Sequence, residues 1–303
     1  MNYTFAGNRT SGIGVSCKRN AKMHSITWMG TGGIAPLLFY PRDIADLSAF
    51  LKDSTSTFNV IGAGSSIVVR DGVMNSVVIK LGQGFCDIKC EGSTITAGCG
   101  ASLKDLVVFA RENSISGFEF CTGVPGTVGG AVSTNVHACG RDMEFLLQSL
   151  LAVNEYGEIC TLSSEEIRGL RGKNVFGNRW IFVEATFVGE KMDSHIIKNT
   201  MNEFAVMRYA SHPVYDKKAI GYIFKSSQVL DGDVCSLIEG AGCKGLRRGH
   251  ALVSEKHCNF VENTGRATAA DIEDLCIEVK DKVRERMQAD LEWGIEFWGT
   301  RVL

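Results

Sequence analysis

The chain contains little proline and no paired cysteine motif, although glycine and cysteine are both plentiful. Four prolines and 34 glycines occur among its 303 residues, so its tight turns depend on glycine. Eleven cysteines are scattered from Cys17 to Cys276, without a Cys-x-x-Cys pair or a second ligand motif of the His-x-x-x-His kind. This spacing argues against a zinc site and predicts no metal. We expect free thiols in a reducing cytoplasm.

Long apolar runs and an excess of one charge are also missing. No run approaches the roughly 18 apolar residues of a membrane-spanning helix, and the basic N-terminal segment lacks the apolar core of a signal peptide. The formal net charge is -2, which favours neither nucleic acid nor an anionic membrane as a partner. We predict a cytoplasmic protein that binds small molecules. The sequence does not determine the oligomeric state, and a monomer is our expectation.

Short β-branched stretches alternate with helical patterns and predict an α+β fold. The expected strands cover residues 37–40, 67–69, 77–80, 94–97, 150–154 and 181–187. One helix is expected to start at Pro41, another after Ser102 with Asp105 in a capping arrangement, and a third over 194–208. The last helix begins at Thr268, and its apolar positions recur at steps of three and four. That stripe comprises Ile272, Leu275, Cys276, Val279, Val283 and Met287.

A glycine-rich stretch, residues 123–140, is the most distinctive part of the sequence. Gly123, Gly126, Gly129 and Gly130 surround Pro125, so side-chain bulk is missing where a ligand could approach the backbone. Free N-H groups together with threonine and serine hydroxyls could hold a pyrophosphate. An ordinary glycine-rich turn between core elements is an equally good interpretation of this stretch alone.

A second glycine cluster, residues 62–66, reads Gly-Ala-Gly-Ser-Ser between two apolar strands. A doubly wound dinucleotide site needs a third glycine and a helix after the turn. Here the third glycine is absent and a strand follows, so we do not interpret this Gly-x-Gly as a Rossmann site. Two such loops attached to strands indicate a different way of holding a dinucleotide.

Further segments follow in a fixed order along the chain. They are Ile26-Thr27-Trp28 with Gly32-Gly33, the two glycine clusters, Gly221 with Phe224-Lys225, Gly245, Val253-Ser254 with His257, and Leu291-Glu292-Trp293. From about residue 24 to residue 299 this series resembles the UDP-N-acetylenolpyruvoylglucosamine reductase family, also called UDP-N-acetylmuramate dehydrogenases. The short segment between Arg208 and Gly221 resembles the class that lacks a tyrosine-bearing insertion.

The resemblance implies a flavoenzyme of peptidoglycan precursor synthesis. Such an enzyme uses NADPH and FAD to reduce the enolpyruvyl group of a UDP-sugar. The implied fold is a two-part FAD-binding region of the vanillyl-alcohol-oxidase type, over 24–212 with lobes 24–98 and 99–212, after an arm at 1–23. A smaller C-terminal α/β substrate domain would cover 213–303. The residues implied to bind FAD are Gly62, Ala63, Gly64, Ser65, Ser66, Thr122, Gly123, Val124, Pro125, Gly126, Thr127, Gly129, Gly130, Ala131 and Asn135.

The family reaction needs a donor on the substrate carboxylate and an acid for the neighbouring carbon. The resemblance assigns the first role to Arg171, whose planar fork can bind a carboxylate, with a solvated surface arginine as the alternative. It puts Tyr222 where the family has a serine, either as proton donor or as a plug in the substrate site. Lys225 matches the family lysine that meets the diphosphate.

Gly294 stands where the family has a glutamate. On a strand, Glu292 and Glu296 would share its face about 7 Å away, and a two-residue shift could bring one of them in. Because two positions differ, a degenerate FAD-binding homologue with weak or lost reductase activity is the alternative function. An oxidase of the wider flavin fold is a third and less favoured alternative, because the sequence shows no histidine or cysteine placed for covalent flavin attachment.

Overall fold

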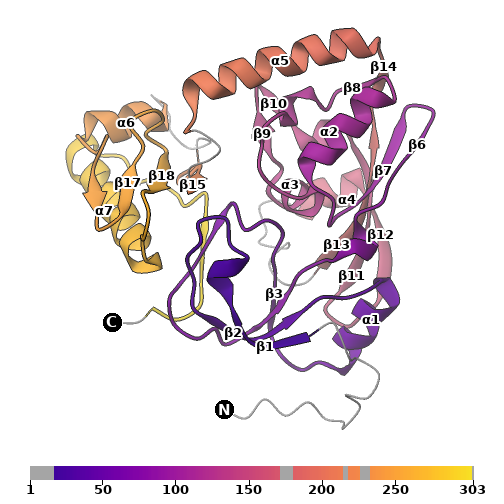
Figure 1. The fold of residues 1–303 in the computed structure, drawn as a ribbon, viewed down its shortest axis with the longest axis horizontal. Coiled ribbons are helices and arrows are strands. Elements are labelled where there is room, and N and C mark those ends of the chain that lie inside the picture. Colours follow the sequence, from indigo (N-terminus) through magenta and orange to yellow (C-terminus); the bar gives the residue numbers. More distant parts are fainter. Residues whose placement is uncertain (1–16, 171–179, 214–217, 226–232, 302–303) are drawn as a thin grey trace. The chain divides into compact units, whose positions relative to one another are not determined.

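In the computed structural model the chain forms two compact units, each assembled from separate segments (Figure 1). Unit 1 comprises residues 1–19, 37–62 and 76–206, and unit 2 comprises 20–36, 63–75 and 207–303. The structure describes residues 17–170, 180–213, 218–225 and 233–301. Unit 2 therefore contains the predicted C-terminal domain together with two segments from the first quarter of the chain, which hydrophobic periodicity does not associate with it.

Short strands and helices alternate along the chain. The α-helices are α1 (Ile44–Asp53), α2 (Leu103–Glu112), α3 (Val128–Thr134), α4 (Ser164–Leu170), α5 (Ser194–Ser211), α6 (Val234–Gly240) and α7 (Ala269–Met287). The 3₁₀ helices are Met23–Ser25, Gln83–Phe85, Glu119–Cys121 and Met143–Phe145. The strands are β1 (Cys17–Lys22), β2 (Ile34–Phe39), β3 (Phe58–Val60), β4 (Ile67–Val69), β5 (Val77–Ile79), β6 (Ile88–Glu91), β7 (Thr94–Gly98), β8 (Ile115–Ser116), β9 (His137–Ala138), β10 (Arg141–Asp142), β11 (Leu147–Asn154), β12 (Ile159–Ser163), β13 (Trp180–Val188), β14 (Glu190–Lys191), β15 (Lys218–Gly221), β16 (Arg247–Arg248), β17 (Ala251–Val253), β18 (Phe260–Asn263) and β19 (Glu296–Trp298).

An antiparallel sheet of five strands, in the order β12-β11-β13-β7-β6, forms the centre of unit 1. Its long strand β13 contributes to two cores, because successive side chains of a strand point to opposite faces, and a register shift against β11 between Leu151 and Ala152 changes the alternation partway along. Phe182 and Phe187 pack with α2 and α3, whereas Ile181 and Val183 pack with α1 and the small parallel sheet β2-β5-β3. The strands predicted over 94–97, 150–154 and 181–187 are confirmed.

Two helix starts in unit 1 show how capping decides a boundary. Ser102 accepts a hydrogen bond from the Asp105 N-H at 3.0 Å, and α2 follows it as predicted. The predicted start of α1 at Pro41 is wrong, because α1 begins at Ile44. Asp43 is the N-cap residue, because its carboxylate accepts from the Asp46 N-H at 2.8 Å.

Unit 2 is built on an antiparallel sheet in the order β15-β18-β17-β16, which packs against α6 and α7. A second pairing joins β4 and β19 in parallel, with Val68 opposite Phe297. The core contains Met29 and Val68, both fully buried, among side chains from residues 220 to 295. The two early segments of unit 2 are thus part of its hydrophobic core.

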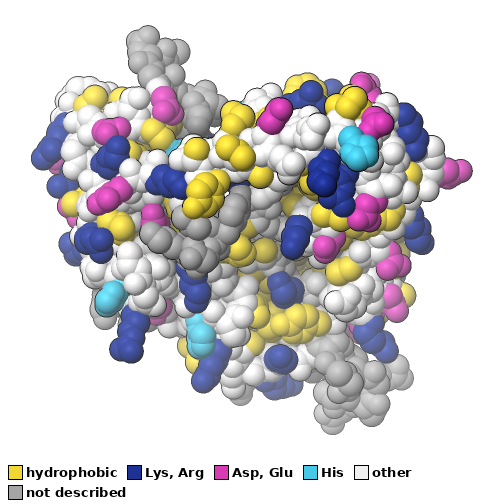
Figure 2. All heavy atoms as spheres, turned by 45° about the horizontal axis from the view of Figure 1, so that its top comes forward, with side chains coloured by type: hydrophobic (Ala, Val, Ile, Leu, Met, Phe, Trp, Pro, Cys, Tyr) yellow, Lys and Arg dark blue, Asp and Glu magenta, His cyan; other side chains and the backbone are white. Residues whose placement is uncertain are grey.

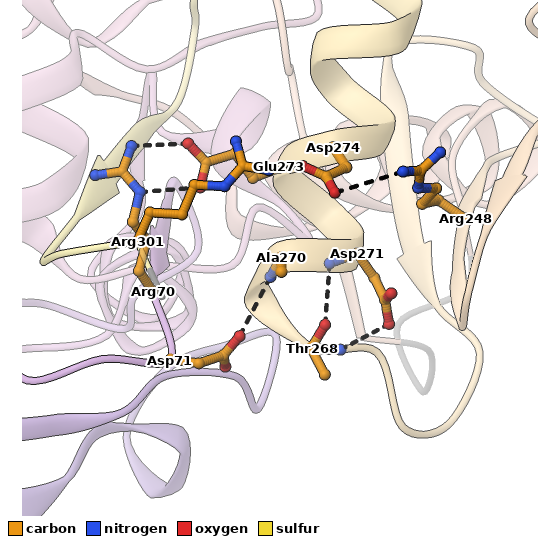
Figure 3. Close-up of polar contacts among 9 residues, drawn as sticks. All are labelled: Arg70, Asp71, Arg248, Thr268, Ala270, Asp271, Glu273, Asp274 and Arg301. Atoms are coloured by element: carbon orange, nitrogen blue, oxygen red, sulfur yellow. Dashed lines mark hydrogen bonds and ion pairs between the residues drawn. The ribbon is translucent and has the colours of Figure 1, made fainter. Parts of the chain in front are cut away.

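An ion pair holds the segment after β4 to helix α7 (Figure 3). The Arg70 guanidinium donates to both carboxylate oxygens of Glu273, at 2.9 and 2.7 Å, and also to the Gly299 carbonyl at 2.8 Å. The Glu273 side chain is only 7% exposed and that of Arg70 26%. Such a two-pronged bond is strong and directional, so it fixes β4, α7 and the segment after β19 together.

The N-terminus of α7 is closed by two carboxylates (Figure 3). Thr268 and Asp271 form the reciprocal capping box, and Asp71 accepts from the N-H groups of Ala269 and Ala270 at 3.3 Å each. Negative charge at this end is favourable because the first N-H groups of a helix lack internal partners. The predicted stripe of α7 is buried except for Met287, which lies exposed in the last turn.

The visible surface carries charges of both signs. Figure 2 shows Lys and Arg side chains interspersed with Asp and Glu side chains. Among the helices of the described residues, none is long and apolar enough to cross a membrane. In the same part of the chain no group of His, Cys, Asp and Glu side chains could hold a metal ion. All eleven cysteines are free thiols.

We expect Arg70→Met to lower the free energy of unfolding by about 3 kcal/mol, because it leaves the buried Glu273 carboxylate without its partner. Urea unfolding followed by tryptophan fluorescence measures the loss, since Trp293 and Trp298 lie in unit 2. The matched control is Arg284→Met, which breaks an exposed pair with Asp281 and should change stability by less than about 0.5 kcal/mol. Equal effects of the two substitutions would contradict the role given to Arg70.

Candidate active site

The two glycine clusters meet within unit 1 at Gly62 and Thr127. A Cβ atom added to Gly62 would lie 2.4 Å from the Thr127 hydroxyl oxygen, so only glycine fits there. The Gly62 carbonyl accepts a hydrogen bond from the Lys80 ammonium group. Burial lowers the pKa of Lys80, which marks this position as one that is partly shielded from water. Lys80 was not predicted, because nothing in the sequence near it distinguishes it from a surface lysine.

Residues 127–134 form a capped helix where the sequence predicted a loop. Thr127 caps α3 by accepting from the Gly130 N-H at 3.3 Å. The N-H groups of Val128 and Gly129 donate to the carbonyls of Ala101 and Cys99, each at 2.9 Å. The expected run of free N-H groups is therefore wrong for the first turn of α3. Gly129 serves close packing instead, since a Cβ there would lie 3.0 Å from Cys99.

The preceding residues 122–126 keep unused polar groups. The Thr122 hydroxyl is buried and has no hydrogen-bond partner in the structure. Gly123 and Gly126 have φ angles of +73° and +154°, which glycine adopts at little cost. A buried hydroxyl without a partner costs about 1–3 kcal/mol, so its presence points to a ligand that supplies the missing bond.

Other predicted residues of this loop have structural roles. The Val124 N-H donates to the Cys121 carbonyl at 3.0 Å, and Ala131 is buried in the core. Asn135 ends α3 with a φ of +47°, and its side-chain oxygen accepts from the Glu144 N-H at 3.0 Å. This asparagine orients the turn after the helix, which an asparagine can do because it tolerates the left-handed conformation.

The rest of the first cluster, residues 63–66, belongs to unit 2. Gly64 has a φ of +69°, and its carbonyl accepts from the Trp28 N-H at 3.4 Å. The Ser66 carbonyl accepts from the Glu296 N-H at 3.1 Å, directly before β4. The segments that contain Trp28 and Glu296 therefore hold this loop through backbone hydrogen bonds.

Tyr222 lies among histidine and aromatic side chains of unit 2. Its hydroxyl is 3.2 Å from His212 Nε2, and its ring meets those of His257 and Phe260 edge to face at about 5 Å. Burial is the largest cause that lowers the pKa of His212, to about 4, and nearby Arg208 adds to it. His212 was missed by the sequence analysis, since ten residues separate it from Tyr222 and no motif links the two.

His257 pairs with a cysteine. Its Nδ1 is 3.2 Å from the Cys235 sulfur. Burial lowers the pKa of His257 and raises that of Cys235, so both groups are neutral near pH 7 and the thiol is not activated as a nucleophile. This geometry gives His257 a structural, hydrogen-bonding role.

Lys225 and Glu292 lie beside each other. The Lys225 N-H donates to the Glu292 carbonyl at 2.9 Å, and the ammonium nitrogen is 3.7 Å from the carboxylate. The expected strand through Glu292 is wrong, because β19 begins at Glu296, whose carboxylate accepts from Trp298 Nε1. Arg171 lies outside the described residues.

Gly294 is a position of close backbone contact. Its N-H donates to the Ile223 carbonyl at 2.8 Å, and an added Cβ would lie 2.5 Å from the Tyr222 carbonyl oxygen. A glutamate at this position requires the backbone of residues 222–224 to move. Glycine at 294 is therefore fitted to the backbone of residues 222–224.

Comparisons with known proteins find a family model that matches each of two parts of the chain. Residues 35–163 match the family model described as an FAD binding domain, and residues 212–298 match that described as the C-terminal domain of UDP-N-acetylenolpyruvoylglucosamine reductase. The reductase of that name from Anaplasma marginale (strain St. Maries) is 44% identical over 299 residues, which is 99% of each chain. The one from Wolbachia pipientis subsp. Culex pipiens is 42% identical and covers 92% of this chain and 95% of its own.

A solved structure shares the fold. The crystal structure of UDP-N-acetylenolpyruvylglucosamine reductase from Thermus caldophilus superimposes with a TM-score of 0.76 at 27% sequence identity. The match covers 92% of this chain and 97% of the other. The predicted fold, an FAD-binding region followed by a reductase C-terminal domain, is confirmed.

Gly294→Ala is expected to lower the free energy of unfolding by about 1–3 kcal/mol, because the added methyl group overpacks the contact with Tyr222. Gly82→Ala is the matched control, since its Cβ would meet only the Pro41 carbonyl at an ordinary 3.6 Å; it should change stability by less than about 0.5 kcal/mol. Thermal unfolding of both variants measures the difference. A Gly294→Ala protein as stable as the control would refute the close contact.

Proposed function

The chain belongs to the UDP-N-acetylenolpyruvoylglucosamine reductase family, and we propose that it reduces the enolpyruvyl group of UDP-N-acetylglucosamine enolpyruvate to give UDP-N-acetylmuramate, a peptidoglycan precursor. FAD is the cofactor and NADPH the reductant. The observation that carries the proposal is the similarity to a reductase over 99% of both chains. The free thiols support a reducing compartment, the cytoplasm. We expect a monomer that binds neither nucleic acid nor membranes.

The glycine loops of unit 1 fit FAD. The unpartnered Thr122 hydroxyl can donate to a phosphate or ribityl oxygen, and Gly123 and Gly126 leave the backbone open beside it. At Gly62 the absence of a side chain makes room for the Thr127 hydroxyl, which brings the two clusters together. When bound, FAD supplies a ring that takes up hydride from NADPH and releases it to the enolpyruvyl carbon. We propose that the remaining predicted loop residues, including Ala63, Ser65, Ser66 and Pro125, complete this site.

Tyr222 is the proposed proton donor. Hydride addition to the terminal carbon of the enolpyruvyl group leaves negative charge that spreads onto the carboxylate, and the neighbouring carbon then needs a proton. Tyr222 brings an O-H to the position where the family has a serine, and its side chain is 41% exposed. We propose that Arg171 stabilises the charge on the carboxylate.

Lys225 is proposed to contact the diphosphate of the substrate. Its ammonium group is half exposed and is paired at 3.7 Å with Glu292, a distance at which the pair is weak. A diphosphate can therefore replace the carboxylate as the partner of Lys225. In the free protein Glu292 keeps the lysine side chain oriented.

Thr122→Val should weaken FAD binding about tenfold, which corresponds to one hydrogen bond of roughly 1.4 kcal/mol. Titration of apoprotein with FAD, followed by flavin fluorescence, measures the dissociation constant. Thr134→Val is the control, because it makes the same change in side-chain chemistry at a hydroxyl that already donates to the Gly130 carbonyl within α3. Unchanged affinity in Thr122→Val would remove Thr122 from the proposed cofactor site.

The reductase proposal is tested by anaerobic reoxidation. The bound flavin is reduced with NADPH and mixed with the enolpyruvyl UDP-sugar, and flavin absorbance is followed. We expect reoxidation by the natural chain and a rate on the order of 100-fold lower in Tyr222→Phe, because the acid is lost. Reduction by NADPH should be equally fast in both proteins. A natural chain that binds FAD but is never reoxidised would be a degenerate homologue.

A further inference from the structure

The hydrogen bonds around His212 determine which ring nitrogen carries the proton. The Ser211 hydroxyl donates to the Met207 carbonyl at 2.8 Å, one turn back in α5. A hydroxyl has a single proton to donate. The Ser211 oxygen must therefore act as an acceptor toward His212 Nδ1, which lies 2.8 Å away, and Nδ1 must carry a hydrogen.

The other nitrogen of His212 then acts as an acceptor. Burial and nearby positive charge lower the pKa of His212 to about 4, so the ring is neutral near pH 7 and holds one proton only. With that proton on Nδ1, Nε2 has a lone pair. The Tyr222 hydroxyl, 3.2 Å from Nε2, donates its proton to this lone pair in the resting protein.

This resting arrangement does not suit a proton donor, because the phenolic proton is directed at His212. Protonation of His212 reverses the bond: Nε2 becomes a donor to the phenolic oxygen, and the Tyr222 proton is released for another acceptor. A protonated imidazole beside the phenol also favours the phenolate that forms when Tyr222 gives up its proton. One extra proton on His212 thus converts the pair into a proton-donating form.

We propose that His212 is a positioning and proton-supplying residue for Tyr222, which donates a proton to the substrate carbon only when His212 is protonated. The inference rests on the proposed function, because it concerns the same proton transfer. In that step the Tyr222 O-H bond breaks, its electron pair stays on oxygen, and a C-H bond forms on the substrate carbon. The Nε2 proton then passes to the phenolate, and His212 regains a proton from water.

The charged groups around His212 explain how substrate binding controls the protonation of His212. Arg208 precedes it on α5, and Lys256 and His257 face it from the turn after β17. Arg208 and Lys256 disfavour a positive charge on His212, and His257 does so only when it is itself protonated. A substrate that carries a diphosphate and a carboxylate offsets this positive surrounding, so its binding favours protonation of His212. The proton is then taken up together with the substrate.

Stopped-flow reoxidation of prereduced protein by the enolpyruvyl UDP-sugar, between pH 5.5 and 8.5, tests the proposal. The natural chain should slow by about tenfold per pH unit above the pKa of His212 in the complex. His212→Gln keeps a fixed donor and should remove this slope; His212→Leu should be slower on the order of 100-fold at pH 6. The exposed His250→Gln is the control and should retain the slope.

A pH-independent natural chain, or a His212→Leu protein as fast as the natural chain, would overturn the proposal while leaving the reductase function in place. Absence of reoxidation at every pH would instead overturn the reductase function and this inference with it. The hydrogen-bond arrangement has a test without turnover: NMR of protein with ¹⁵N-labelled histidine should show the Nδ1-H form of His212 at pH 7, titrating below pH 5. An Nε2-H form would refute the arrangement.

Discussion

The bond between Arg70 and Glu273 holds together the most unusual part of this fold, the use of an early chain segment within the C-terminal core. Residues 63–75 include one short strand, β4, of three residues, and its pairing partner β19 comes from the other end of the chain. The guanidinium joins this segment to α7 and to the Gly299 carbonyl. A buried pair of this kind gains little net energy but tolerates only one geometry, so it specifies position. The Gly64–Ser66 turn lies directly before β4, so the same ion pair also helps to fix where this turn lies.

The proposed FAD loops of unit 1 and the surroundings of Tyr222 in unit 2 have opposite requirements. In the proposed FAD loops the Thr122 hydroxyl is left without a hydrogen-bond partner in the protein, because the ligand itself is expected to complete its contacts. Around Tyr222 the polar groups are already joined within the protein: Tyr222, His212, Ser211 and Met207 form a continuous series of hydrogen bonds. The contacts of the FAD loops are completed when the ligand binds. The hydrogen bonds around Tyr222 are formed before the substrate binds, and they fix which atoms carry the protons.

Local signals in the sequence predicted much of the fold. The caps at Ser102 and Thr268 and the stripe of α7 depend on residues within one or two helical turns, and the structure has them as expected. The start of α1 was misplaced because Pro41 and Asp43 are both acceptable starting signals, and sequence alone does not rank them. The short helix α3 was missed because its glycines have a low helix propensity. The carbonyls of Cys99 and Ala101, more than twenty residues earlier, accept hydrogen bonds from its first turn.

The candidate site was predictable only where a motif is contiguous. The glycine clusters and the Tyr222 segment were found in this way, and their ligand roles stay predictions. His212 and Lys80 could not be found, because their significance comes from contacts with Tyr222 and Gly62 that form only in the folded chain. The order of motifs along the chain carried the family assignment, since it depends on no single contact.

The placement of Met29 and Val68 in the core of unit 2 has a consequence for how this protein family can change. The stretch that the family model describes as the C-terminal domain, residues 212–298, does not contain all of its own hydrophobic core, and Glu273 finds its counter-charge outside it. This stretch cannot fold alone when it is transferred to another protein. A transferred copy would lack two core side chains and would carry a buried carboxylate without a cation. Substitutions in its interior must therefore stay compatible with residues near the beginning of the chain, and the two regions are bound to evolve together.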